Sequence, residues 1–255
     1  MFTIALSLLR APRLSTDLES FVSFPETKRL YVPSGLSNLK DRKNDRLFSG
    51  LSDTMSPRQY NLAIGACIVY GFVINAIIVA TCSDFLIRMN PVVFLVGYFV
   101  LAITGIVMTT KSNNPVISFV GYNLVVVPLG AVLATVLPGH SAGQVFHAVV
   151  ITGVIFVVMT CLATIFPQTF AKLGRGLFIS LIVLIITQLL ALFVFGFAGT
   201  IFSWAGAIIF TLYIGYDWHV AQSYPKTLDN AIDSACDLYI DLVNLLIDVL
   251  NIIDR

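Results

Sequence analysis

Residues 229–255 read DNAIDSACDLYIDLVNLLIDVLNIIDR, and this stretch decides the fold. At a helical period its polar residues fall on one face, because successive members are three or four positions apart. This acidic stripe consists of Asn230, Asp233, Asp237, Asp241, Asn244, Asp248, Asn251 and Arg255. The remaining faces of the helix carry mainly Leu, Ile and Val.

The acidic stripe limits where such a helix can lie. An ionised carboxylate in hydrocarbon costs at least about 2.5 kcal/mol, so we expect the stripe to face other helices or water held among them. One alternative is an amphipathic helix on the membrane surface, but such helices favour Lys and Arg on their polar face. A half-buried helix of a soluble domain is the other, and the composition of the chain argues against it.

The whole chain has the composition of an integral membrane protein. Of its 255 residues, 57% are hydrophobic and only 11% are charged, whereas soluble domains have about 25% charged residues. The mean hydropathy is +0.90. The net charge of +1, without a basic cluster, gives no support to a nucleic-acid partner. The lipid bilayer is therefore the expected partner.

Seven apolar runs follow one another after residue 59. They lie at about 60–81, 91–110, 116–137, 145–166, 177–197, 200–222 and 234–253. Each approaches the roughly 20 residues that cross the hydrocarbon core. We therefore predict an all-α membrane protein with seven transmembrane helices in residues 56–255. Residues 1–55 are rich in polar residues, and we predict a flexible tail there.

Lys and Arg in the links predict the orientation. With the N-terminus in the cytosol, the outer side holds only Arg88 and Arg255. The inner side then holds Arg42, Lys43, Arg46, Arg58, Lys111, Lys172, Arg175 and Lys226. The positive-inside rule favours this orientation, with the C-terminus outside. We expect the plasma membrane, or an intracellular membrane if the source is eukaryotic.

Asp217, in the sixth predicted span, is the clearest ionisable candidate outside the last helix. Acids within spans usually mark ion or proton pathways, although a carboxylate satisfied by a neighbouring amide or Tyr is an alternative. A short link favours antiparallel neighbours, so Asp217 can approach Asp241, which lies deeper when counted from the turn. Two close carboxylates would share one proton and form a pH switch. Lys111 is either a cationic partner for these acids or a simple anchor.

Enzyme chemistry has little support in the sequence. Neither a Gly-rich phosphate loop nor a Gly-x-Ser-x-Gly element occurs. His140, His147 and His219 do not have the i, i+4 spacing of a metal site, which leaves a seven-span metal hydrolase as a weak alternative. We expect no enzyme activity, no bound metal and no cofactor apart from transient calcium or proton binding.

Several segments resemble the transmembrane Bax-inhibitor-motif family. Gly215-Tyr216-Asp217 lies in the sixth span, and DLYIDLVNLL at 237–246 lies in the last helix. RQYNL at 58–62 opens the first span, and KSNNP at 111–115 is similar to bacterial members. The likeness covers residues 56–255.

The resemblance implies a fold of two three-helix layers around a central C-terminal helix. It also implies a pH-sensitive calcium leak channel whose sensor is a hydrogen-bonded pair, here Asp217 and Asp241. Some members have an Arg that contacts this pair, and Lys111 in that region keeps the charge but loses the bidentate geometry. Asp237 and Asp248 lie outside the pair and are candidates to line the path.

Two functions are therefore expected. The first is a cation leak channel for calcium, gated by protonation of Asp217 and Asp241, because hard cations prefer oxygen ligands that carboxylates and Asn244 supply. The second is a non-transporting regulator that binds other membrane proteins, such as proteases or cell-death factors. In that case the acidic stripe would be a buried specificity network.

Overall fold

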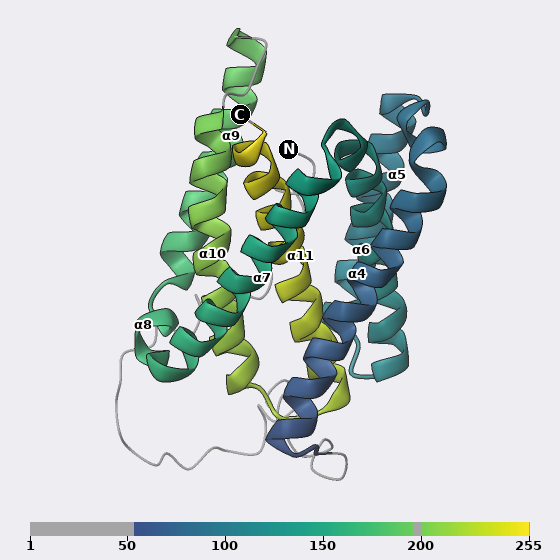
Figure 1. Ribbon diagram of the computed structural model, residues 1–255. Coiled ribbons are helices and arrows are strands. Elements are labelled where there is room, and N and C mark those ends of the chain that lie inside the picture. The colour runs from purple at the N-terminus through teal and green to yellow at the C-terminus, as the bar shows by residue number, and fades with distance from the viewer. Residues whose placement is uncertain (1–53, 196–199, 255) are drawn as a thin grey trace, which may run out of the picture.

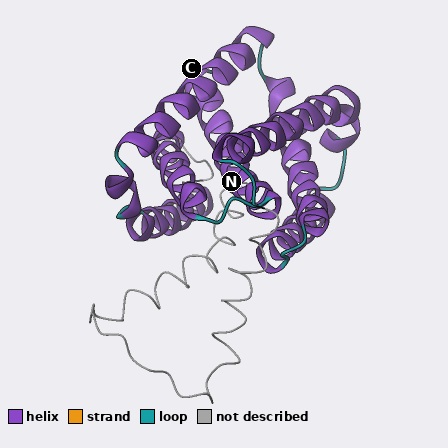
Figure 2. Cartoon of the chain, turned by 90° about the horizontal axis from the view of Figure 1, so that it is seen from below, coloured by secondary structure: helices purple, strands orange, loops and turns teal. Residues whose placement is uncertain are grey.

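The structure is a computed structural model that describes residues 54–195 and 200–254, so almost all of the predicted tail lies outside the described residues. The described part contains helices and no strand (Figures 1 and 2). Its long helices are α4 (Pro57–Ile87), α5 (Pro91–Lys111), α6 (Pro115–Val136), α7 (Ala142–Ile165), α9 (Gly174–Phe195), α10 (Thr200–Ser223) and α11 (Leu228–Ile253). A 3₁₀ turn, η2 (Leu137–Gly139), and the short α8 (Pro167–Ala171) complete them.

Five helical segments in the described part are long and apolar enough to cross a membrane. They are Pro57–Ile87, Pro91–Lys111, Pro115–Gly139, Ala142–Ile165 and Gly174–Ala191. The prediction of an all-helical, multi-pass membrane protein is thereby confirmed. Helices α10 and α11 have 24 and 26 residues, which lies within the range of 21 to 31 residues of the other long helices.

Capping residues explain where several helices begin. Ser56 and Ser141 each form a capping box, with Gln59 and Gln144 respectively. Asn90 and Asn114 cap α5 and α6, each with Pro at the following position. These side chains satisfy N–H groups that have no partner within the helix.

Several boundaries differ from the sequence prediction: α11 already begins at Leu228 instead of near residue 234, and α4 continues to Ile87 instead of ending near residue 81. Polar side chains in the last part of α4 bond back to carbonyls of the same helix. Thr81 Oγ1 donates to Ile77 O at 2.7 Å, and Ser83 Oγ donates to Val79 O at 2.6 Å. The predicted link at 167–176 also contains a helix, α8, which begins with proline.

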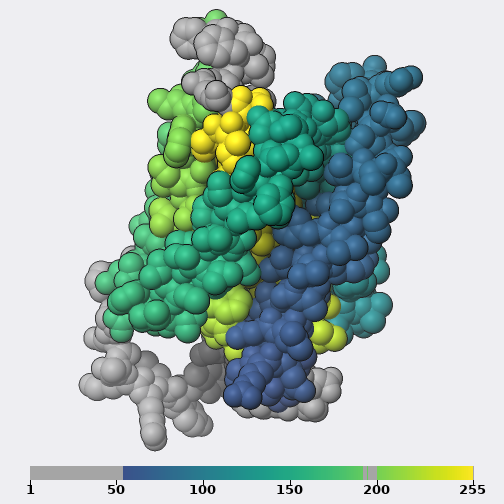
Figure 3. All heavy atoms as spheres, in the orientation of Figure 1, coloured from purple at the N-terminus to yellow at the C-terminus, as the bar shows by residue number. Residues whose placement is uncertain are grey.

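Helix α11 lies among the other helices (Figure 1), and in the space-filling view they cover most of it from this side (Figure 3). It contacts α4 and α6 on one side and α7 and α10 on the other. Asp241 is 0% exposed, Asn244 is 2% exposed and Asp248 is 7% exposed. The prediction that the acidic stripe faces other helices is confirmed for its buried members, and the alternative of a helix lying on the membrane surface is wrong. Arg255, the last residue of the stripe, lies outside the described residues.

Glycines bring α5 and α6 close together. A Cβ on Gly121 would lie 2.8 Å from Gly105 O and 2.9 Å from Met108 Cβ, so neither backbone has room for a larger residue there. Small residues at helix interfaces are typical of membrane proteins, because close backbone packing supplies much of the attraction. The α5–α6 pair therefore depends on these two glycines.

Buried tyrosines join α4 and α6 to α11. The rings of Tyr122 and Tyr239 lie against Gly71, where a side chain would overlap them. Tyr122 OH donates to Cys67 O at 2.7 Å, and the Asn75 amide donates to Tyr239 OH. The rings also meet edge to face at a centroid distance of 5.7 Å. These contacts fix the position of α11 relative to α4.

We expect Gly121→Ala to lower the free energy of unfolding by about 1–3 kcal/mol, because the added methyl group overpacks the α5–α6 contact. Thermal denaturation of the detergent-purified protein would show a lower Tm. Gly153→Ala on α7 is the matched control, since nothing lies within 4 Å of its Cβ position. Equal Tm values for the two variants would contradict this account.

Candidate functional site

The predicted site residues lie on three helices: Asp237, Asp241, Asn244 and Asp248 on α11, Asp217 on α10, and Lys111 at the end of α5. Helices α10 and α11 are consecutive and antiparallel, and they lie side by side along most of their length (Figure 1). Asp241 is fully buried, whereas Asp217 and Asp237 are half-buried.

Contacts at both ends fix the alignment of α10 with α11. Near the C-terminal end of α11, Gly206 lies against the Asp248 carboxyl, which occupies the space where a side chain on Gly206 would be. Near the α10–α11 link, Tyr60 OH lies 3.1 Å from Ala221 O and 3.3 Å from Asn230 O. Tyr60 of α4 thus holds the two helices together at that end.

This alignment determines how far apart Asp217 and Asp241 lie along the two helices. Counted along the two helices from these contacts, Asp217 lies level with residues 234–237 of α11, so Asp241 is about one to two turns further along. Side chains on a helix lean toward its N-terminus. Because the helices are antiparallel, Asp217 and Asp241 lean toward each other along the axis. The offset expected from counting residues is therefore reduced without any unwinding of α10, which stays helical to Ser223.

Helix α8 fixes the backbone of α10 beside Asp217. The Phe170 ring packs onto Gly215, where a Cβ would overlap it. The ring of Tyr216 packs in the same way onto Gly174 at the start of α9. These contacts could not be predicted from the sequence, because a glycine within a helix, a glycine at a helix start and a lone Phe carry no periodic signal.

Asp248 lies apart from the other acids. It is about two turns, or roughly 10 Å, from Asp241 along α11. Its carboxyl lies against the α10 backbone because Gly206 has no side chain. The Asn244 amide, between these acids in sequence, donates to Ile240 O at 2.8 Å. The described residues contain no group of three His, Cys, Asp or Glu side chains that could hold a metal ion.

A polar network surrounds the start of α11. Ser118 Oγ of α6 donates to Asp229 Oδ1 at 2.7 Å, and Tyr60 OH lies 3.2 Å from Ser234 Oγ. Asp229 was outside the predicted stripe, although it precedes Asp233 by one helical turn. This spacing could have identified Asp229 as a member of the stripe. Its hydrogen-bond partner on α6, Ser118, could not be predicted from the sequence.

Lys226 belongs to the same region. Its Nζ lies 4.4 Å from the Tyr60 ring centroid and donates to Gln222 O at 2.8 Å. Burial lowers the pKa of Lys226. Lys226 O also accepts a bond from Met55 N at 2.7 Å, so the segment preceding α4 is held on the α10–α11 link.

The structure does not bring Lys111 to the aspartates. It is exposed at the end of α5, a helix that packs mainly on α6. Its side chain makes no ion pair or hydrogen bond with any residue in the described ranges. This placement fits the interpretation of Lys111 as a positively charged anchor at the membrane boundary.

Comparison with known proteins identifies the family. Residues 54–255 match the family model described as Inhibitor of apoptosis-promoting Bax1. An uncharacterised protein of Helicobacter pylori is 30% identical over 225 residues, which is 84% of this chain and 96% of the relative. Bax inhibitor 1 of Schizosaccharomyces pombe is 28% identical and aligns over 67% of this chain and 64% of its own length.

Part of the chain is also similar to a viral protein. The Golgi anti-apoptotic protein of vaccinia virus is 29% identical over 123 residues, which is 48% of this chain and 52% of the viral protein. The family resemblance drawn from 215–217 and 237–246 is confirmed by the match over 54–255. The chain belongs to the Bax inhibitor family of membrane proteins.

Proposed function

We propose that this protein is a pH-sensitive cation leak channel that conducts calcium and is gated by Asp217 and Asp241. The observation that supports the proposal most strongly is the burial of Asp241, which is 0% exposed on a helix enclosed by four others. Buried acids within a membrane protein usually mark ion or proton pathways. In this proposal the protein is not an enzyme and needs no cofactor.

The proposal includes seven spans, with the N-terminus in the cytosol and the C-terminus outside. Helices α10 and α11 exceed the roughly 20 residues needed to cross the bilayer, and the buried acids Asp241 and Asp248 lie against other helices. Helix α6 contacts α4 and α5, while α10 contacts α7 and α9. These contacts support two three-helix layers around α11.

The aspartate pair would gate the path through its charge. With one shared proton or two, a hydrogen bond between Asp217 and Asp241 holds α10 against α11, which is the closed form. When both carboxylates are ionised they repel each other or bind a cation, since like charges are costly in a low dielectric. Calcium flux should therefore rise with pH.

Oxygen groups along α11 would carry the ion past the gate. Asp237, Asn244 and Asp248 lie on one side of this helix at intervals of one to two turns. Carboxylate and amide oxygens are the ligands that Ca²⁺ prefers. Asp248 and Asn244 are both buried, so a cation beside them would be shielded from lipid.

A second candidate is a regulator that binds other membrane proteins without transporting ions. The names Bax inhibitor 1 and Golgi anti-apoptotic protein, carried by two of the relatives, favour it. The buried acids would then serve specificity of folding instead of conduction. A stoichiometric partner captured from detergent, with no flux through the purified protein in liposomes, would support this candidate over the channel.

We expect Asp217→Asn and Asp241→Asn to remove the pH dependence of calcium flux into proteoliposomes between pH 6 and 8. A neutral amide cannot ionise, so both variants should stay near the low flux of the parent at pH 6. Asp84→Asn, which changes an exposed acid in the last turn of α4, is the control and should keep the parent profile. A parent-like profile in both gate variants would refute the gating role.

Asp248→Asn should give a different result in the same assay. We expect flux to fall several-fold at every pH while the pH midpoint stays unchanged, because Asp248 is about 10 Å from Asp241 along the helix. A shifted midpoint would place Asp248 in the gate, and an unchanged flux would remove it from the path.

A further inference from the structure

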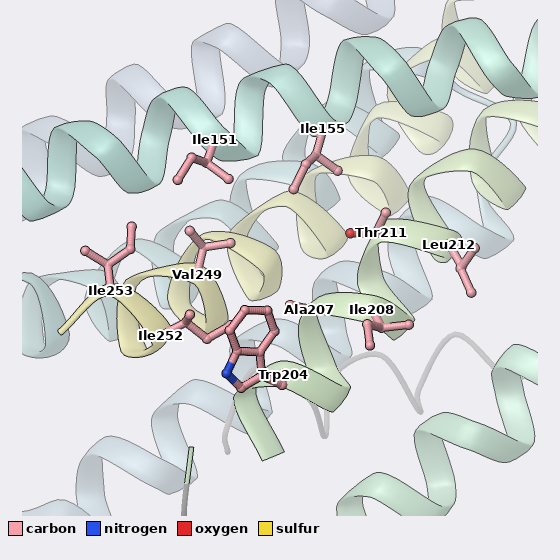
Figure 4. A pocket seen from close by; sticks show the side chains of 10 residues that line it. All are labelled: Ile151, Ile155, Trp204, Ala207, Ile208, Thr211, Leu212, Val249, Ile252 and Ile253. Carbon is pink, nitrogen blue, oxygen red and sulfur yellow. The ribbon is translucent and has the colours of Figure 1, made fainter. Parts of the chain in front are cut away.

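A pocket of about 410 Å³ lies between α7, α10 and the C-terminal end of α11. Figure 4 shows Ile151 and Ile155 of α7 on one side, Trp204 and Ala207 of α10 on the other, and Val249 and Ile252 of α11 between them. Its volume is in the range of small-molecule sites, which is about 300–1,000 Å³. Its lining is almost entirely hydrocarbon, with one hydroxyl, on Thr211.

The surroundings of the pocket are those of a membrane-facing site. Ile208 and Trp204 on its rim are 60% and 57% exposed, and α7 is one of the helices apolar enough to span a bilayer. With α10 spanning the bilayer beside α7, as proposed above, the exposed apolar side chains of both helices are covered by lipid tails. A ligand therefore reaches this pocket from the hydrocarbon, which favours a molecule already dissolved there.

Polar side chains lie beside one end of the pocket. Its floor on α11 reaches Ile253, and Asp254 comes next. Gln144 Nε2 donates to Asp254 Oδ1 at 2.9 Å, and His140 Nε2 lies 3.7 Å from Asp254 Oδ2. Trp204 lies near the start of α10, and indole rings favour the level of lipid head groups. The pocket thus has an apolar body and a polar, partly exposed end.

We propose that this pocket binds one acyl chain of a membrane phospholipid, with the head group beside Asp254, Gln144 and His140. This end has an acid beside a neutral amide donor, which suits a zwitterionic head group, since Asp254 can face its ammonium and Gln144 its phosphate. The bound chain would rest on Val249 and Ile252 of the central helix. The proposal is independent of ion conduction, and its test has no flux readout.

The test is native mass spectrometry of the delipidated protein with added dioleoylphosphatidylcholine. We expect the parent to retain one lipid per chain. Ala207→Phe, which fills the pocket, should reduce retention at least tenfold at the same lipid concentration. Ile179→Phe is the matched control, because it adds the same bulk to an exposed site on α9 outside the pocket, and it should retain lipid like the parent.

A fluorescence titration gives an answer even if Ala207→Phe does not fold. In the Trp218→Phe background, Trp204 is the one remaining indole. Phosphatidylcholine with brominated chains should quench it with saturation near one lipid per chain. Non-saturating quenching, absence of retained lipid on the parent, or equal retention by Ala207→Phe and the parent would overturn the proposal. So would preferential retention of oleic acid when it is added together with the phospholipid, which the mass distinguishes.

Discussion

The cost of placing a carboxylate in hydrocarbon governs this structure. Helix α11 carries aspartates at intervals along its length, so it cannot face lipid on any side where they lie. The solution is to enclose it: α4, α6, α7 and α10 all contact it, and Asp241 is completely buried. The outer helices have the opposite character, with apolar side chains exposed where lipid tails can cover them.

Close packing around α11 is achieved with glycines placed where a specific group needs room. Gly71 admits the rings of Tyr122 and Tyr239, and Gly206 admits the carboxyl of Asp248. At each glycine, a polar or aromatic group of one helix therefore packs directly on the backbone of another helix. This is how buried oxygens and rings can share a narrow interior with hydrocarbon side chains.

Much of the fold could be predicted from the sequence, because long apolar runs and a helical period of polar residues are local patterns. The burial of Asp241 and Asp248 followed from charge alone. The helix α8, the bond from Ser118 to Asp229 and the packing of Phe170 on Gly215 could not be predicted, because each depends on contacts between segments far apart in the sequence. From its position in the sequence, Lys111 could be either a cationic partner of the aspartates or a membrane anchor. Its exposure at the end of α5 fits the anchor.

The bonds of Tyr60 have a consequence for biosynthesis. Its hydroxyl partners, Ala221, Asn230 and Ser234, follow it by 161 to 174 residues. Helix α4 therefore gains these bonds only after α10 and α11 have been synthesised. Until then the Tyr60 hydroxyl must find other partners, either water at the membrane boundary or groups of the membrane-insertion machinery.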